Sequence, residues 1–175
     1  MNAPLTIQIL DVSHAQVYRQ LMLQAYALHP DSFTSTAAER ESLPLDWWRA
    51  RLAPEAQAGE RVIGAWVGGE LVGVVGVSFE RREKTRHKAA LFGMYVDARF
   101  RQQGLGEKLV LAVIEAARQR GGVRLIQLTV SNGNIAAYRL YERCGFRPWG
   151  LEPYAVRQGD QFIDKMHMWR ELDGA

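Results

Sequence analysis

A short segment with two glycines is the part of the sequence whose residue types and spacing most clearly suggest chemistry. Residues 101–106 read RQQGLG and stand between an apolar run and a stretch with helical periodicity. The start of a helix offers unpaired backbone N–H groups and a positive dipole end, so anions bind there. Gly104 and Gly106 have no Cβ to keep a phosphate away, and Arg99 and Arg101 could neutralise its charge. The segment predicts a turn that binds a diphosphate.

Three phosphate-binding motifs can be compared with this segment. The Walker motif needs Lys and then Ser or Thr after its last glycine, but Glu107 follows Gly106. The dinucleotide fingerprint needs a third glycine at the position of Leu109. The remaining pattern is Arg or Gln, two residues, Gly, one residue, then Gly or Ala, and Arg101, Gly104 and Gly106 match it. Taken alone, a loop with two glycines and no ligand explains the hexapeptide equally well.

The apolar pattern predicts the elements that position this turn. Strands are expected at Leu5–Leu10, Val62–Val67, Leu71–Phe79, Ala89–Val96, Val123–Val130, Phe146–Leu151 and Phe162–Leu172. Helices are expected at Ser13–Leu28 with Ser13 as N-cap, at Pro44–Leu52, from Leu105 to the glycines after residue 120, and at Asn134–Cys144. Gly68-Gly69 predicts a tight hairpin. The strand, helix, strand order around residues 89–130 favours a parallel pair with a right-handed crossover.

A second motif lies one strand after the turn. Residues 134–146 read NIAAYRLYERCGF. Together with RQQGLG, this segment resembles the signature of the GNAT superfamily of N-acetyltransferases. The residues that stand at the family spacing are Asn134, Ala137, Leu140, Tyr141, Gly145 and Phe146. The resemblance covers residues 62–150 well, and the first 60 residues match only in the order of their elements.

The resemblance implies a fold and a domain organisation. The fold class is α/β with a mixed (α+β) sheet of about seven mostly antiparallel strands, a central parallel pair and about four helices. A single GNAT domain is expected over residues 1–175, since no linker or repeat divides the chain.

The resemblance also implies acetyl-coenzyme A as the donor substrate. Its pantetheine arm would lie in a V-shaped opening between the two parallel strands and pair with backbone around Met94 and Val96. Its pyrophosphate would sit on the amides of the turn, which are those of Arg101, Gln102, Gln103, Gly104, Leu105 and Gly106. Asn134 would cap its helix, either alone or with an additional contact to the coenzyme.

Acetyl transfer to an amine needs residues that move protons. An amine like that of lysine has a pKa near 10.4 and must lose a proton before it attacks the thioester. The resemblance assigns Tyr141 as the acid that protonates the leaving thiolate, with Tyr138 as a less favoured substitute. Glu80, Glu83 and His87 are candidates for the base, although an exposed histidine in a charged run is the more ordinary explanation for His87.

The acceptor is less well defined than the donor. The leading hypothesis is an N-acetyltransferase that acts on a primary amine of a small molecule or peptide by direct attack. The alternative is a non-catalytic acyl-coenzyme A binding or sensor module. Candidate lining residues are Trp47, Trp48, Trp149 and Tyr154, with Glu152 and Asp164 to hold a cation, although the aromatic residues could equally belong to the core or to a homodimer surface.

Composition and charge exclude several other classes of protein. The apolar run at Leu71–Val77 is far shorter than the roughly 20 residues that span a bilayer, so no membrane association is expected. The first ten residues lack the features of a secretory signal, and a cytoplasmic location is expected. The basic run Arg81–Lys88 has no aromatic interleaving, so no nucleic acid partner is expected. The four histidines show no metal-ligand spacing, Cys144 is expected to be a small buried residue, and no metal is expected.

Overall fold

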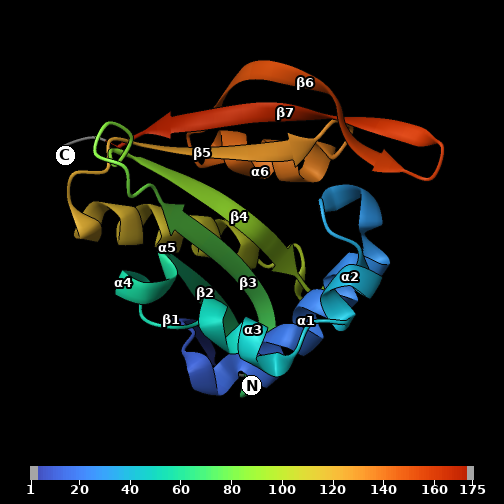
Figure 1. The fold of residues 1–175 in the computed structure, drawn as a ribbon, viewed down its shortest axis with the longest axis vertical. Helices are drawn as coiled ribbons and strands as arrows, with labels where there is room; N and C mark the ends of the chain where they lie inside the picture. The colour runs from blue at the N-terminus through green and yellow to red at the C-terminus, as the bar shows by residue number, and fades with distance from the viewer. Residues whose placement is uncertain (1–3, 173–175) are drawn as a thin grey trace.

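One twisted sheet organises the molecule (Figure 1), in a computed structural model that describes residues 4–172. The strand order is β1-β2-β3-β4-β5-β7-β6. The strands are β1 (Leu5–Ile9), β2 (Glu60–Val67), β3 (Glu70–Phe79), β4 (Lys88–Val96), β5 (Leu125–Ser131), β6 (Arg147–Gln158) and β7 (Gln161–Glu171). Neighbouring strands are antiparallel except β4 and β5.

Helices cover both faces of this sheet. The α-helices are α1 (Ala15–Leu28), α2 (Ala37–Glu41), α3 (Leu45–Arg51), α4 (Glu55–Ala58), α5 (Leu105–Arg120) and α6 (Ile135–Arg143). Short 3-10 turns are η1 (Val12–His14), η2 (Pro30–Ser32) and η3 (Ala98–Phe100). Four helices of the described chain have seven or more residues. The expected fold class, a mixed sheet of seven strands with one parallel pair, is confirmed.

The two faces of the sheet carry separate apolar cores. On one face, the buried residues of α5 and α6 pack against Val72, Val75 and Ile126 of the strands. On the other face, α1 and α3 pack against Val62 and Val74. In Figure 1, α5 and α6 lie on one side of the strands, and α1, α2 and α3 lie together at the other end of the molecule. The sheet is therefore the layer from which both sets of helices are positioned.

The parallel pair is short, and this controls the shape of the site. β4 and β5 pair only from Lys88↔Leu125 to Ala90↔Gln127. Six more residues of β4 and four more of β5 follow without pairing to each other. Figure 1 shows β4 running away from β5 over this length. The V-shaped opening expected between the strands is present in the structure.

Several local predictions need correction. The first helical segment begins with η1, and its N-cap is Asp11 rather than Ser13, because the Asp11 carboxylate accepts hydrogen bonds from both the backbone N–H and the hydroxyl of Ser13. The short helices α2 and α4 were not predicted. The last two strands pair over nearly their whole length around a turn at Gly159, so β6 extends seven residues beyond the expected end at Leu151.

Core packing beneath the sheet gives a direct test of the fold. Leu109 is fully buried on α5, whereas Leu111 on the same helix is 47 % exposed. We expect Leu109→Ala to lower the free energy of unfolding by about 2–5 kcal/mol, because it removes buried methyl groups and leaves a cavity. Leu111→Ala should change it by less than about 1 kcal/mol. Urea denaturation of both variants measures the difference, and equal losses would contradict the assigned face of α5.

Candidate active site

The glycine turn has the geometry of an anion site. Gly104 is the N-cap of α5, has a left-handed backbone (φ 76°) and provides no side-chain cap. Gln102 also has a positive φ, 60°, which is uncommon for a residue other than glycine. Left-handed residues in a turn gather successive N–H groups on one side, where an anion can bind. The first helical hydrogen bond joins Lys108 N–H to Gly104 C=O. The N–H groups that precede Lys108 in the first turn therefore have no acceptor within the helix.

The two arginines beside the turn are not equivalent. Arg99 donates to the carboxylate of Asp97 and pairs with Glu70, so its charge is already compensated. Asp97 is 4 % exposed and also accepts from the backbone N–H of Arg99 at 2.9 Å. The hydrogen bonds from Arg99 lower the pKa of Asp97. Arg99 therefore anchors the start of the turn and does not offer a free charge at its rim.

Arg101 lies across one end of the opening. Its Nε donates to the carbonyl of Val96 at 2.9 Å, and its terminal nitrogen lies 2.8 Å from Nε2 of His29. The guanidinium also lies over the ring of Tyr95. The backbone N–H of Arg101 donates to the carbonyl of Ala98 at 3.4 Å, so this amide of the turn already has a hydrogen-bond partner. His29 was not a predicted site residue.

A long groove runs from this turn along the open part of β4, with a volume of about 580 Å³. The long groove is lined by Met94, Tyr95 and Val96 of β4, by Phe100, Arg101, Gln102, Gly104, Leu105, Gly106 and Glu107 of the turn and α5, by Asn134, Ala136, Ala137, Leu140 and Arg143 of α6, and by His29, Ser32 and Phe33 after α1. Its volume is in the usual range for sites that bind small molecules and cofactors. The structure thus brings together nearly all of the predicted cofactor-binding residues.

A bulge in β4 marks the middle of the site. The β3–β4 register passes from Val74↔Tyr95 to Gly76↔Phe92, so Gly93 and Met94 together stand opposite a single residue of β3. Gly93 has a φ of 59°, which a residue with a side chain rarely adopts. Bulges of this kind leave backbone N–H groups outside the ladder and are frequent beside active sites. This geometry takes Gly93 and Met94 out of the regular β3–β4 register.

A second cavity, the small pocket, lies next to the bulge. Its volume is about 230 Å³. It is lined by Tyr18, Met22, Tyr26, Ser32, Phe33, Thr34, Ser35, Arg40, Arg51, Leu91, Phe92, Gly93, Thr129 and Lys165. Ser32 and Phe33 line both cavities, and Gly93 of the small pocket is followed directly by Met94 of the long groove. The two cavities meet at the β4 bulge.

The helix α6 carries two of the predicted residues in different environments. Asn134 lines the long groove, and its Oδ1 accepts the N–H of Ala137 at 3.2 Å, so it is an N-cap. Tyr141 is 5 % exposed and packs edge to face on Phe146. Burial raises the pKa of Tyr141 well above its ordinary value. Its ring belongs to the core and does not line the groove, although its neighbour Leu140 does.

Comparison with known proteins decides the family. A model described as "Acetyltransferase (GNAT) family" matches residues 22–146, which is more than half of the 175 residues. The match includes the turn, the parallel pair and α6. The chain belongs to the GNAT family. The expected enzyme class, an acetyl-coenzyme A dependent N-acetyltransferase, is confirmed by this membership.

Relatives of this GNAT chain are named for different amines. The L-amino acid N-acetyltransferase AaaT of Escherichia coli is 32 % identical over 124 residues, which cover 70 % of this chain and 74 % of the relative. The spermine/spermidine N(1)-acetyltransferase of Bacillus subtilis is 32 % identical over 88 residues, covering 49 % of this chain and 58 % of that protein. Both relatives are N-acetyltransferases, but their names describe acceptors of different charge.

Solved structures show the same GNAT fold. An acetyltransferase of the GNAT family from Streptococcus pneumoniae has a TM-score of 0.86 at 25 % identity, and the match covers 97 % of this chain and 99 % of that one. The yncA protein of Salmonella typhimurium, described as solved with its cofactor acetyl-CoA, has a TM-score of 0.79 at 22 % identity, covering 99 % and 96 %. The fold of these structures extends over nearly the full length of the chain.

The candidate bases Glu80, Glu83 and His87 lie away from the β4 bulge. His87 precedes β4, and its carbonyl accepts from the backbone of Arg124 and Leu125, at the closed end of the parallel pair. Glu80 accepts from Thr85 within the charged connector, and neither Glu80 nor Glu83 lines the long groove or the small pocket. The sheet therefore separates these three residues from Met94 by most of the length of β4.

The expected acceptor lining is also not assembled. Trp48 is buried in the core, and Trp149 and Tyr154 are exposed on β6. Glu152 pairs with His167, and the carboxylate of Asp164 accepts from the backbone of Tyr154. None of these five candidates lines the small pocket, and neither does the sixth, Trp47; the charged residues of this pocket are basic. A homodimer through exposed aromatic residues stays a prediction.

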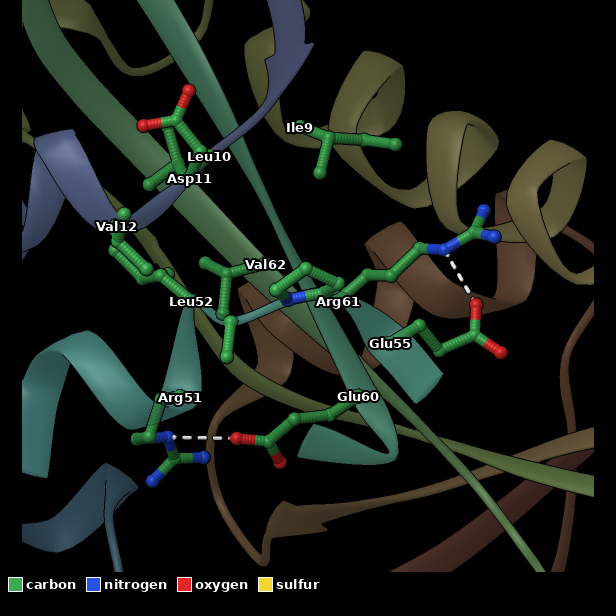
Figure 2. Close-up of a pocket in the computed structure, with 12 residues that line it drawn as sticks. Ile9, Leu10, Asp11, Val12, Arg51, Leu52, Glu55, Glu60, Arg61 and Val62 are labelled. Carbon is green, nitrogen blue, oxygen red and sulfur yellow. Dashed lines mark ion pairs between the residues drawn. The ribbon is translucent and has the colours of Figure 1, made fainter. Parts of the chain in front are cut away.

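Figure 2 shows a separate hollow between the end of β1, α3 and β2. Its walls are mostly apolar, and two ion pairs cross its rim, Arg61–Glu55 at 2.6 Å and Arg51–Glu60 at 3.0 Å. Arg51 lines both this hollow and the small pocket. The hollow includes neither the β4 bulge nor the glycine turn. It matters for the small pocket because Glu60, which lines the hollow, orients Arg51.

Residues 4–172 contain neither a metal-binding cluster nor a helix that could span a membrane. No group of three or more His, Cys, Asp or Glu side chains in this range could hold a metal ion. No helix in the same range has the length and apolar character needed to cross a membrane. The expected cytoplasmic location and the expected lack of a nucleic acid partner stay predictions.

Some residues of the site were missed although the sequence held a signal for them. Arg143 follows Ala136 and Leu140 at helical spacing of four and three, which places all three on one face of α6 and in the groove. Asp97 directly precedes the turn, where a short acidic residue commonly caps a helical segment, and it caps η3. The basic residues of the small pocket gave no such signal, because they come from α2, α3 and β7.

The Asp97–Arg99 contact predicts a pH-dependent stability. Asp97→Asn should lower the free energy of unfolding at pH 7 by about 1–3 kcal/mol, because it removes a buried charge-assisted hydrogen bond. Since the folded pKa of Asp97 is depressed, this stability is present above the unfolded pKa, about 3.9, and is lost as pH falls through the folded value. Urea melts between pH 2 and 7 measure the convergence of the two proteins. Asp46→Asn, which breaks an exposed pair with Arg49, should have little effect at any pH.

Proposed function

We propose that this enzyme, as one domain over residues 1–175, transfers an acetyl group from acetyl-coenzyme A directly to a primary amine of a small molecule or peptide. The observation that carries this proposal is that a cofactor-sized groove and a small pocket meet at the β4 bulge. The thioester would lie at this junction, with the donor on one side and the acceptor on the other. Residues 1–3 and 173–175 of the domain lie outside the described range.

The donor would be held mainly by backbone groups. Its pyrophosphate would bind the free amides between Gln102 and Gly106, supported by Arg143 at the groove wall. Its pantetheine arm would lie along the open part of β4, as an extra strand beside Val96. Arg101 donates a hydrogen bond to the Val96 carbonyl in this structure. We propose that Arg101 donates to a phosphate of the coenzyme in place of this carbonyl when the coenzyme binds.

The bulge would supply the electrostatic part of catalysis. Attack by the amine converts the thioester carbonyl into an oxyanion, which preorganised N–H groups stabilise. The amides at Gly93 and Met94 stand outside the β3–β4 register, so they are available for this task. This attack forms the carbon–nitrogen bond, and collapse of the oxyanion then re-forms the carbonyl and breaks the carbon–sulfur bond, which releases the thiolate.

Two protons must move in this reaction. The acceptor ammonium would lose its proton to water in the small pocket, because the candidate bases Glu80 and His87 lie outside it. We propose Tyr141 as the donor of a proton to the leaving thiolate, because its raised pKa keeps it protonated at neutral pH and its neighbour Leu140 lines the long groove, although the buried ring of Tyr141 does not itself line it. The amide product and free coenzyme A would then leave.

The alternative function is a non-catalytic acyl-coenzyme A sensor. It would need the long groove but would have no use for a second cavity at the bulge. The named relatives are enzymes, which favours catalysis. Release of free thiol from acetyl-coenzyme A in the presence of an amine distinguishes the two functions.

Gly106 offers a test of the donor site. A Cβ at this position would lie 3.1 Å from Leu140 and 3.4 Å from Met94, both of which line the long groove. We expect Gly106→Val to weaken acetyl-coenzyme A binding by at least about tenfold, because the side chain narrows the groove beside the turn. Gly150→Ala is the control, since nothing lies within 4 Å of its Cβ position. Calorimetric titration measures both, and equal affinities would contradict the proposed donor site.

Tyr141 offers a test of the proton donor. We expect Tyr141→Phe to lower kcat by about 10²–10⁴-fold with little change in acetyl-coenzyme A binding, because a general acid acts only in the reaction. Tyr138→Phe, one turn earlier on α6, should have little effect on kcat. Because the pKa of Tyr141 is raised, wild-type kcat should not fall on its deprotonation below pH 10. A full rate for Tyr141→Phe would remove this residue from the mechanism.

A further inference from the structure

The small pocket is basic, which limits the amines that it can accept. Its charged lining residues are Arg40, Arg51 and Lys165, and no Asp or Glu lines it among the described residues. Like charges in close proximity raise the free energy of binding, so an acceptor with several ammonium groups is disfavoured. An acceptor with an anionic group would compensate this charge.

Arg40 is a cation of this pocket whose charge is not compensated by an ion pair within the described residues. Its guanidinium lies over the ring of Trp47 at 4.6 Å and donates to the hydroxyl of Ser35 at 2.8 Å. Its Nε is buried and has no hydrogen-bond partner. Within residues 4–172 no carboxylate forms an ion pair with it. A buried donor without a partner is costly, and a ligand carboxylate would satisfy it.

Arg51 contributes a second guanidinium from α3. Its Nε faces Glu60 at 3.0 Å, as Figure 2 shows, and its guanidinium also lies over the rings of Trp47 and Phe92. These contacts fix the orientation of Arg51 in the wall of the small pocket. Glu60 lies in the neighbouring hollow, so it compensates Arg51 from outside the small pocket.

Lys165 adds a third positive charge from β7. Its Nζ donates to the hydroxyl of Thr34 at 2.9 Å. Glu152 is its cross-strand neighbour in β6 but forms its ion pair with His167. The charges of the pocket therefore sum to a positive value even when both Glu60 and Glu152 are counted.

The uncharged part of the wall combines apolar and aromatic side chains with hydroxyl groups. The apolar and aromatic members are Tyr18, Met22, Tyr26, Phe33, Leu91 and Phe92, and the hydroxyl groups come from Ser32, Thr34, Ser35 and Thr129. At about 230 Å³, the cavity is smaller than the roughly 300–1,000 Å³ of sites for drug-sized ligands. This size and lining fit one compact molecule with an apolar side chain.

We propose that the acceptor is a free amino acid with an apolar side chain, whose carboxylate is bound by Arg40 and Arg51 and whose amine points toward the bulge at Gly93. This inference rests on the acetyl transfer proposed above. The same positive charges would favour the neutral, nucleophilic form of the acceptor amine, since nearby like charges disfavour its protonation. The positive charges of the small pocket would thus both bind the carboxylate of the amino acid and assist deprotonation of its amine.

The decisive experiment compares an amino acid with the same molecule lacking its negative charge. Turnover of L-methionine and L-phenylalanine is measured beside their primary amides and spermidine, with acetyl-coenzyme A held at saturation. A charge-assisted contact contributes about 1.5–3 kcal/mol, so kcat/KM should favour each amino acid over its amide by about 10- to 100-fold. Equal or better use of the amides, a preference for spermidine, or no turnover of any amino acid would overturn the assignment.

The Arg40→Gln variant tests whether this preference comes from the small pocket. Arg40 is chosen over Arg51 because loss of Arg51 would leave Glu60 without its ion-pair partner. We expect Arg40→Gln to lower kcat/KM for the amino acid at least tenfold and for its amide less than threefold. Arg49→Gln, on the exposed side of α3, is the matched control and should change neither. Equal losses for amino acid and amide would show a structural effect and overturn the carboxylate contact. The thermal shift of the protein on addition of acetyl-coenzyme A tests the donor site separately. If the coenzyme does not raise the melting temperature, acetyl transfer itself is refuted.

Discussion

The separation of β4 from β5 is the constraint on which the rest of the site depends. The two strands hold each other for three residue pairs and then diverge. Unpaired backbone groups in a protein interior are costly unless something satisfies them. In this fold the opening is lined by the turn, α6 and the segment after α1, and the long groove fills it. The structure therefore presents an extended strand edge inside the molecule, which suits a ligand that can itself behave as a strand.

Glycines place backbone at the two ends of this opening. At the turn, Gly104 takes a left-handed conformation and Gly106 leaves room between Met94 and Leu140. At the bulge, Gly93 takes another left-handed conformation and removes two residues from the β3 register. Both features are changes of backbone conformation, so neither depends on a side chain that a sequence motif would reveal as catalytic. In the proposed complex, recognition of the donor would for this reason depend mostly on the backbone.

The sequence predicted the donor half of the site far better than the acceptor half. The turn and α6 are local segments, so their residue spacing specifies their geometry, and the parallel pair followed from the order of elements. His87 and Glu80 stay predictions. They lie toward the closed end of the parallel pair, and proximity to β4 along the chain does not tell which end of the strand opens. The small pocket could not be predicted, because Arg40, Arg51 and Lys165 come from three elements that are brought together only by the tertiary fold.

This division explains how one family can share a donor and differ in acceptors. The donor groove is made by β4, the turn and α6, which lie within the region that matches the family model. The small pocket instead takes its charge from α2, α3 and β7, and β7 lies beyond that region. A change of two or three side chains there can reverse the sign of the pocket without disturbing the β4 bulge. Under the proposed function, the charge of the acceptor would therefore be inferred from the assembled pocket and not from sequence identity to a relative.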